Sequence, residues 1–279
     1  GKWFAPHFEK MLSDNAQLAS IYADAYRLAK DPEHGRMARS VVQWILRELK
    51  DEDEGFHSAV DADSEGEEGK YYVWTAAEIL DILGSAEAKL YGELYGIEDA
   101  GNWHDEASGE KHATNIPHLK RSLDDEAVSR NREPDDLIAQ VQSMNTRLLE
   151  QRSQRPWPIV DDKVLAGWNG LAISALAKAG SALEIEGFIE SARLAGSFVT
   201  RKLFEADKFY ATYRSGTARL EAYLDDYAFV ANGLLDLYDA TRAKRWLETA
   251  RRLAGWMIER FYSEDQSFYF TSHDHEELI

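Results

Sequence analysis

Ionisable side chains stand six to eight positions before each of three asparagines in this sequence. The three sets are His7 and Glu9 before Asn15, Asp162 and Lys163 before Asn169, and Asp225 and Asp226 before Asn232. Because the spacing recurs, we expect each set near the start of a helix, where free N–H groups and the helix dipole stabilise a carboxylate by about 0.3–1 kcal/mol. The alternative for each aspartate is a helix N-cap without further function. Capping explains neither the first set nor Lys163.

A second group of acidic residues lies in the segment 56–74. Asp61 and Asp63 alternate with apolar or small residues, a Glu- and Gly-rich stretch follows, and residues 70–74 return with aromatic side chains. This pattern predicts a β-hairpin with an acidic tip, in which Asp61 and Asp63 lie nearest the strands. The segment starts like a calcium-binding loop, but its twelfth position is Tyr72 and not glutamate. We therefore expect no metal and no other cofactor.

Aromatic side chains next to these charged positions indicate a sugar site. An aromatic face can stack on the C–H face of a sugar ring, while carboxylates accept hydrogen bonds from its hydroxyls. The residues predicted to be catalytic are His7, Asp63, Asp162 and Asp226. The residues predicted to contact the substrate are Glu9, Asp61, Lys163, Trp168, Asn169, Asp225 and Tyr227.

Two reaction types fit these residues. Glycoside hydrolysis needs one protonated and one ionised carboxyl group, which the aspartates of these sets can supply. Epimerisation needs acid–base groups on both sides of one carbon atom. His7 is the one candidate near these motifs for acid–base chemistry at neutral pH, and it has no convincing partner other than the option of His57, which counts against strict epimerase chemistry.

The elements that must position these residues follow an internal repeat. Each asparagine introduces a segment that is apolar on nearly all faces, then an amphipathic segment, and an aromatic stretch 36 to 41 residues further on. The apolar segments are 18–28, 171–179 and 229–238. This order predicts an inner helix, an outer helix and a short strand in each repeat.

A fourth, less regular helical pair is expected at about 75–96 and 134–154, with a long polar loop at about 98–132. Four such hairpins predict a mainly α protein of the α/α-toroid type, or a curved α-solenoid. An irregular helical bundle is the alternative. We expect a single domain over residues 1–279.

Composition narrows the classes of partner. The chain has 279 residues, with 50 Asp and Glu against 32 Lys and Arg, and a formal net charge of −18. This charge opposes binding to nucleic acid or to an anionic membrane, so we expect neither as a partner. The sequence has no cysteine, which excludes disulfides and cysteine-ligated metals within it. No stretch has the pattern of a membrane span or a secretory signal, and we expect a cytoplasmic protein.

Four motifs, taken together and in order, resemble one known family. They are PHFEKMLSDNAQLA at 6–19, DADSEGEEGKYYVWT at 61–75, DDKVLAGWNGLAISALAKA at 161–179 and YLDDYAFVANGLLDLYDAT at 223–241. These motifs are similar to those of the bacterial YyaL-type proteins and of their animal relative, spermatogenesis-associated protein 20. The resemblance covers almost the whole chain. Ser13 departs from it where an aromatic residue is usual, without changing a charge at the expected site.

The resemblance implies a six-hairpin α/α toroid, as in N-acylglucosamine 2-epimerases and several glycoside hydrolases. It also implies an upstream thioredoxin-like domain in the full-length chain, so four hairpins indicate a fragment cut at both ends. We expect a carbohydrate-active protein, epimerase-, isomerase- or glycosidase-like, whose acidic and aromatic central cavity binds a sugar or another small polar ligand. The alternative is a non-catalytic binding or scaffolding toroid that accompanies the redox domain.

Overall fold

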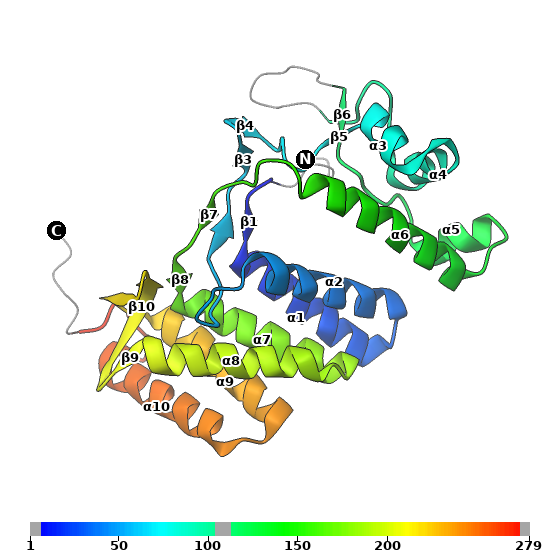
Figure 1. Ribbon diagram of the computed structural model, residues 1–279. Helices are drawn as coiled ribbons and strands as arrows, with labels where there is room; N and C mark the ends of the chain where they lie inside the picture. Colours follow the sequence, from blue (N-terminus) through cyan, green and yellow to red (C-terminus); the bar gives the residue numbers. More distant parts are fainter. Residues whose placement is uncertain (1–6, 104–112, 274–279) are drawn as a thin grey trace. The chain divides into compact units, whose positions relative to one another are not determined.

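The structure is a computed structural model that describes residues 7–103 and 113–273 (Figure 1). The chain is mainly helical and divides into two compact units. The smaller unit consists of Gly1–Glu9 and Asp61–Ile159, and the larger unit of Lys10–Val60 and Val160–Ile279. No helix within the described ranges is long and apolar enough to cross a membrane.

Three helical hairpins build the larger unit (Figure 1). The inner and outer helices are α1 (Leu12–Ala29) with α2 (Pro32–Glu48), α7 (Ala166–Leu183) with α8 (Glu186–Lys202), and α9 (Leu224–Thr241) with α10 (Lys244–Phe261). Helix α7 packs on both α1 and α9. Because it has neighbours on nearly all sides, 12 of its residues are buried, as its apolar sequence predicts. The three predicted inner and outer pairs are confirmed.

The outer helix α2 shows how an amphipathic sequence forms its element. Asp31 caps the helix, since its side chain accepts a hydrogen bond from the Glu33 N–H at 2.9 Å, and Pro32 occupies the first helical position. The buried residues include Ala38 and Val42, one turn apart. One face of the helix therefore packs on the unit while the other stays in solvent.

Small residues let the inner helices α7 and α9 approach closely. A Cβ atom on Gly170 would lie 2.5 Å from backbone atoms of Phe229 on α9, a distance that no real side chain tolerates. Gly233 of α9 in turn faces the backbone of Gly170. The two helices therefore touch through their backbones, and their N-terminal ends lie side by side.

Short strands lead into the inner helices. β1 (Lys10–Met11), β2 (Ala59–Val60) and β7 (Val160–Asp161) form one antiparallel sheet. A second sheet consists of β8 (Val164–Leu165), β10 (Lys208–Arg214) and β11 (Thr217–Glu221), with β9 (Phe204–Glu205) paired to β10. β1 continues directly into α1 and β8 into α7.

The smaller unit begins with an acidic hairpin. β3 (Asp63–Ser64) pairs with β4 (Glu67–Glu68) across a two-residue turn, in which Glu65 and Gly66 have φ values of 54° and 79°. Two positive φ angles are typical of a type I′ turn. The acidic tip is therefore present, but residues 70–74 do not complete the hairpin as predicted. Instead β5 (Trp74–Thr75) pairs with β6 (Thr114–Asn115).

Four helices complete the smaller unit: α3 (Ala76–Leu83), α4 (Ser85–Tyr95), α5 (Leu123–Ser129) and α6 (Pro134–Arg152). They share one apolar core, to which Leu137, Val141 and Met144 of α6 contribute. The prediction of one helix over 75–96 was wrong, because Gly84 with a φ of 76° ends α3. The predicted polar loop 98–132 contains β6 and α5.

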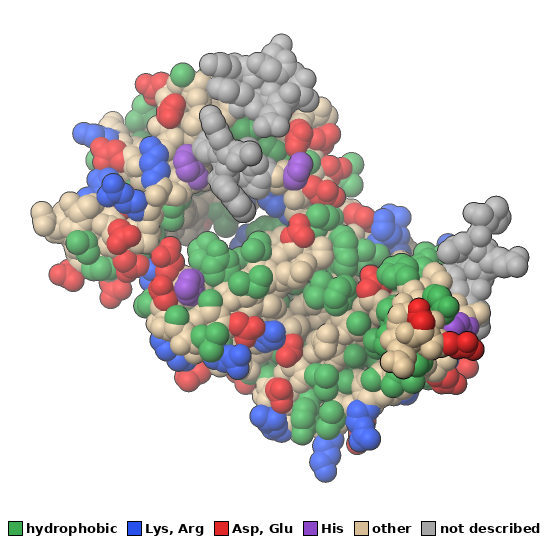
Figure 2. Space-filling model, turned by 180° about the vertical axis from the view of Figure 1, so that it is seen from behind, with side chains coloured by type: hydrophobic (Ala, Val, Ile, Leu, Met, Phe, Trp, Pro, Cys, Tyr) green, Lys and Arg blue, Asp and Glu red, His purple; other side chains and the backbone are tan. Residues whose placement is uncertain are grey.

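The surface carries charges of both signs. Figure 2 shows acidic side chains interspersed with Lys and Arg on one face, with apolar side chains exposed between them. Arg193, for example, pairs with Glu186 at 2.8 Å and with Glu190 at 2.9 Å. Exposed pairs of this kind contribute at most about 1 kcal/mol. The charge excess therefore bears on partners more than on the fold.

Candidate functional site

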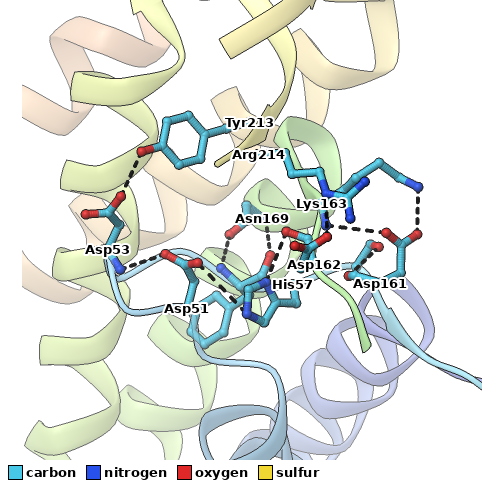
Figure 3. A network of polar contacts seen from close by, with 11 residues as sticks. Asp51, Asp53, His57, Asp161, Asp162, Lys163, Asn169, Tyr213 and Arg214 are labelled. Atoms are coloured by element: carbon cyan, nitrogen blue, oxygen red, sulfur yellow. Dashed lines mark hydrogen bonds and ion pairs between the residues drawn. The ribbon is translucent and has the colours of Figure 1, made fainter. Parts of the chain in front are cut away.

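A polar network lies in the larger unit where the chain passes from β7 to β8 (Figure 3). The Asp162 carboxylate pairs with Arg214 Nε at 2.6 Å, and the Asp161 carboxylate pairs with Lys163 Nζ at 2.8 Å. Two neighbouring carboxylates thus bind different cations. Three residues predicted from the sequence, Asp162, Lys163 and Asn169, belong to this network.

His57 lies at the centre of the network (Figure 3). Its Nδ1 lies 3.2 Å from the carbonyl oxygen of Asp162, and its Nε2 lies 3.9 Å from the Asp51 carboxylate. A carbonyl can only accept, so the contact selects the tautomer with the proton on Nδ1. Nε2 is then a proton acceptor that faces Asp51. The side chain is 21% exposed, so a small molecule in solvent can reach it.

The other carboxylates of the network are held in their ionised form. Partial burial acts to raise the pKa of Asp161, but the ammonium and the backbone N–H of Lys163 outweigh it and hold the pKa below its ordinary value. Tyr213 Oη donates to Asp53 at 2.7 Å and Lys202 Nζ donates to it at 3.3 Å, and these bonds lower the pKa of Asp53. Neither group carries a proton to donate at neutral pH.

Asp226 lies in the first turn of α9 and has the opposite property. One carboxylate oxygen accepts from the Gly167 N–H at 2.8 Å, and the other accepts from the Tyr223 N–H at 3.0 Å. The side chain therefore caps α9 and ties it to α7. Burial raises the pKa of Asp226 to about 6, which the two N–H bonds do not reverse. Such a carboxyl group exchanges its proton near neutral pH, as a catalytic acid must.

The three charged sets were predicted to occupy equivalent positions relative to the starts of their inner helices. This holds for the sets before Asn15 and Asn169. α1 and α7 begin three residues before Asn15 and Asn169, and both asparagines donate to the carbonyl four residues earlier, at 2.8 and 2.9 Å. α9 begins at Leu224, eight residues before Asn232. Equivalence of the third set was therefore wrong. Capping by Asp226 starts this helix earlier, so its charged pair lies inside the helix.

Two residues predicted to contact a substrate are packed inside the larger unit. Asn169 has no exposed surface, and its amide exchanges hydrogen bonds of 2.9 and 3.0 Å with the backbone of Phe56. Tyr227 is 2% exposed, and its ring packs on Phe209 and Phe261. We correct the prediction for both residues. They pack against or bond to neighbouring segments of the larger unit, and their side chains are not accessible to a ligand.

The remaining predicted residues of the larger unit are accessible. Trp168 is half-buried against the apolar core, while Lys163 and Asp225 are exposed. The Asp225 carboxylate accepts from the Asp226 N–H at 3.1 Å. Contact with a substrate stays a prediction for these three residues.

Four predicted residues belong to the smaller unit: His7, Glu9, Asp61 and Asp63, all of them exposed. The Asp61 carboxylate accepts from the Asp63 N–H at 3.1 Å. One site that joins these residues with Asp162 and Asp226 stays a prediction.

Asp63 lines a cavity of about 730 Å³ within the smaller unit. Arg155 on its wall donates to the carbonyls of Tyr71 and Val73 at 2.9 and 2.8 Å, and its guanidinium stacks 4.1 Å from the Trp74 ring centre. Arg155 is therefore engaged in holding the chain and is not available to bind an anion.

Sequence reasoning missed Arg214, Asp51 and Tyr213. Arg214 reaches Asp162 because Thr212 and Tyr213 of β10 lie opposite Leu165 and Val164 of β8. No local pattern reveals the register of strands so far apart in the sequence. The structure places no group of three His, Asp or Glu side chains that could hold a metal ion in the ranges 7–103 and 113–273.

Curated mammalian proteins similar to this chain are named spermatogenesis-associated protein 20. Spermatogenesis-associated protein 20 of Mus musculus is 34% identical over 97% of the chain, and that of Homo sapiens is 35% identical over 97%. An uncharacterized protein of Caenorhabditis elegans is 28% identical over 96%. The chain spans about two fifths of the length of these relatives, 38% to 40%. No protein-family model matches the chain. The family resemblance is confirmed for this portion.

Among solved structures, unsaturated glucuronyl hydrolase from Bacillus sp. GL1 is similar in fold. The similarity covers 94% of this chain and 50% of the hydrolase, with 11% sequence identity and a TM-score of 0.51. At this identity the similarity concerns the fold alone. The predicted fold class, an α/α toroid of the six-hairpin glycosidase type, is confirmed.

Proposed function

This chain is a homologue of spermatogenesis-associated protein 20, and we propose that it is a carbohydrate-active enzyme of the sugar epimerase, isomerase or glycoside hydrolase type. Asp226 carries the proposal, as a carboxyl group with a pKa of about 6 at the start of an inner helix. Support also comes from the fold, which occurs in a hydrolase responsible for glycosaminoglycan degradation.

Asp226 is the proposed general acid. Protonation of the leaving oxygen of a glycoside, or of a ring-opening sugar, needs an acid that keeps its proton until the substrate is bound. A pKa of about 6 leaves a useful protonated fraction near neutral pH. An ordinary aspartate, with a pKa of 3.8, would have lost nearly all of it.

Asp162 is the proposed second carboxylate. Arg214 Nε lies 2.6 Å from the Asp162 carboxylate and compensates its negative charge. The carboxylate can therefore stay ionised, as a base or nucleophile must, without destabilising the segment between β7 and β8. For epimerisation, His57 is the proposed base, because its Nε2, which faces the Asp51 carboxylate, carries no proton in the tautomer that the Asp162 carbonyl selects. The catalytic roles of His7 and Asp63, which belong to the smaller unit, remain proposals.

A non-catalytic binding or scaffolding toroid is the second candidate. It is favoured by the engagement of both Asp226 oxygens with backbone N–H groups, which is what a purely structural helix cap requires. The relatives are also more than twice as long as this chain, so a further domain can carry the chemistry. A thioredoxin-like domain of that kind is a proposal drawn from the resemblance.

Turnover assays separate the two candidates. Reducing sugars report epimerisation or isomerisation, and a glycoside panel that includes an unsaturated glucuronyl disaccharide reports hydrolysis. Asp226→Asn preserves the side-chain volume and removes the titratable proton, so we expect kcat/KM to fall about 100-fold or more. Asp162→Asn tests the second carboxylate. Glu248→Gln, an exposed carboxylate on the outer helix α10, is the control that should leave turnover unchanged.

An absence of turnover over the whole panel with the folded parent protein would overturn the enzyme proposal. Turnover that Asp226→Asn leaves intact, while circular dichroism shows the native helix content, would overturn the role of Asp226 as the general acid, which is the observation that carries the proposal. Ligand binding without turnover would favour the binding toroid.

A further inference from the structure

A cavity of about 530 Å³ lies on the face that α1, α7 and α9 share within the larger unit. We propose that this inner-face cavity binds an uncharged polyhydroxylated ligand of monosaccharide size. The ligand class rests on the proposed function, but the cavity is distinct from the polar network in Figure 3. None of the residues argued for above as catalytic lines it.

One wall of the inner-face cavity is apolar and aromatic. Phe229 and Leu235 come from α9, Leu171 from α7, and Ile21 from α1, where it is 64% exposed. Phe229 follows Asp226 by three residues, so both side chains lie on the same stripe of α9. A sugar ring on Phe229 would therefore extend toward the proposed acid one turn away.

The same helices also present uncharged hydrogen-bonding groups to the cavity. Ser20 and Asn232 line the cavity and have no hydrogen-bond partner among the residues that the structure describes. Gln17 donates to the Ser13 carbonyl at 3.1 Å, which leaves its side-chain oxygen to accept. The contrast with the other asparagines of the repeat is informative. Asn15 and Asn169 bond to their own helices, whereas Asn232 is exposed and faces the cavity.

The charged groups of the cavity are paired with one another, one ammonium lying between two carboxylates. Lys178 Nζ lies 3.2 Å from the Asp24 carboxylate and 3.9 Å from that of Asp236, so one ammonium bridges α1 and α9 across α7. Ser174 Oγ donates to the same Asp236 oxygen. A cationic ligand would compete with Lys178 for the two carboxylates, and an anionic ligand would be repelled by them. These charged groups therefore suit a neutral ligand whose hydroxyls can both donate to Asp236 and accept from Lys178.

The same charges argue against a helix as the occupant of this face. A covering apolar helix would remove Asp24, Lys178 and Asp236 from water, and the desolvation of such a group of charges outweighs much of their attraction. A hydroxyl-rich ligand replaces the lost water with hydrogen bonds of its own. Partial burial also raises the pKa of Asp236.

Ligand binding to the parent chain and its variants tests the proposal. Isothermal titration calorimetry with glucose, mannose and N-acetylglucosamine represents the neutral class, with glucuronate and spermidine as the charged comparisons. We expect binding of at least one neutral sugar and none of either ion. Loss of one hydrogen bond weakens binding by about 3- to 10-fold, so Asn232→Ala should have this effect, and Ser20→Ala serves as a second variant with little risk to folding. Glu248→Gln on the outer helix should bind like the parent chain.

The results test the inner-face cavity separately from the proposed enzyme function. Sugar binding that weakens in Asn232→Ala and Ser20→Ala supports the inner-face cavity even where no turnover is found. Turnover or binding that neither variant alters would overturn the cavity while leaving the enzyme proposal intact. Binding of spermidine or glucuronate alone, or of no probe at all, would also overturn it.

Discussion

Replacing Asp226 by Asn is expected to stabilise the chain at neutral pH and to have much less effect at pH 4. The folded-state pKa of Asp226 is about 6, above the ordinary value of 3.8. A carboxyl group with a raised folded-state pKa favours folding while it is protonated. Its contribution is therefore complete below about pH 4 and is lost as the pH rises through about 6.

The magnitude follows from the size of the shift. A difference of about two pKa units, at about 1.4 kcal/mol for each unit, destabilises the fold by about 3 kcal/mol at pH 7.5. The asparagine has one acceptor oxygen in place of two, so it loses one of the bonds from the Gly167 and Tyr223 N–H groups, or about 1 kcal/mol at either pH. We expect a net gain of about 2 kcal/mol at pH 7.5 and a small loss at pH 4.

Urea unfolding followed by far-UV circular dichroism measures this difference directly. Parent chain and variant are compared at pH 4 and at pH 7.5, and the quantity of interest is the change in their stability difference between the two pH values. Asp225→Asn is the matched control. It keeps the Asp226 carboxyl group, so the large change in stability difference expected for Asp226→Asn between the two pH values should not appear.

A stability difference between parent and Asp226→Asn that stays constant from pH 4 to pH 7.5 would refute the reasoning. It would mean that water or relaxation of the helix end solvates the carboxylate, so that burial does not raise its pKa. The candidate acid of the proposed function would then lose its physical basis.

Two further predictions concern the packing of the inner helices. Gly170→Ala should destabilise the larger unit by about 1–3 kcal/mol, because the new Cβ atom would meet the backbone of Phe229 at 2.5 Å. Its control is Gly255→Ala on α10, where the new Cβ atom meets nothing within 4 Å, and this substitution should stabilise the helix by up to about 1 kcal/mol. Asn169→Ala should lower the free energy of unfolding by about 2–5 kcal/mol, since it leaves buried N–H and C=O groups of Phe56 unpaired. Thermal unfolding checks both, and equal midpoints for the two glycine variants, or for Asn169→Ala and the parent chain, would contradict them.

Most of the helical architecture was predictable because hydrophobic periodicity is a local property. Apolar residues on all faces identified α7 as an inner helix, and a single apolar stripe identified α2 and α10 as outer helices. The failures were also local. Gly84 divides a predicted helix into α3 and α4, and Ser122 caps the short helix α5 within an expected loop. Single turn and cap residues set helix boundaries, and periodicity does not detect them.

The candidate site was predictable only in part. The sequence placed Asp162 and Asp226 near inner-helix starts, but it gave them equivalent positions, which they do not have. It also predicted that Asn169 and Tyr227 contact a substrate, although both are buried. Residue type and spacing do not distinguish a polar group that faces a cavity from one that bonds to a distant backbone segment.

The sequence by itself determined the fold class, the family and the order of inner and outer helices, because these depend on residue patterns within each segment. The tertiary structure decided which carboxyl group has a raised pKa, since burial of Asp226 requires α7 and α9 to meet at Gly167. It also decided the partner of Asp162, because Arg214 arrives through strand register, and it left Asn232 facing a cavity. Desolvation and register arise between segments that are distant in sequence, so only the packed chain fixes them.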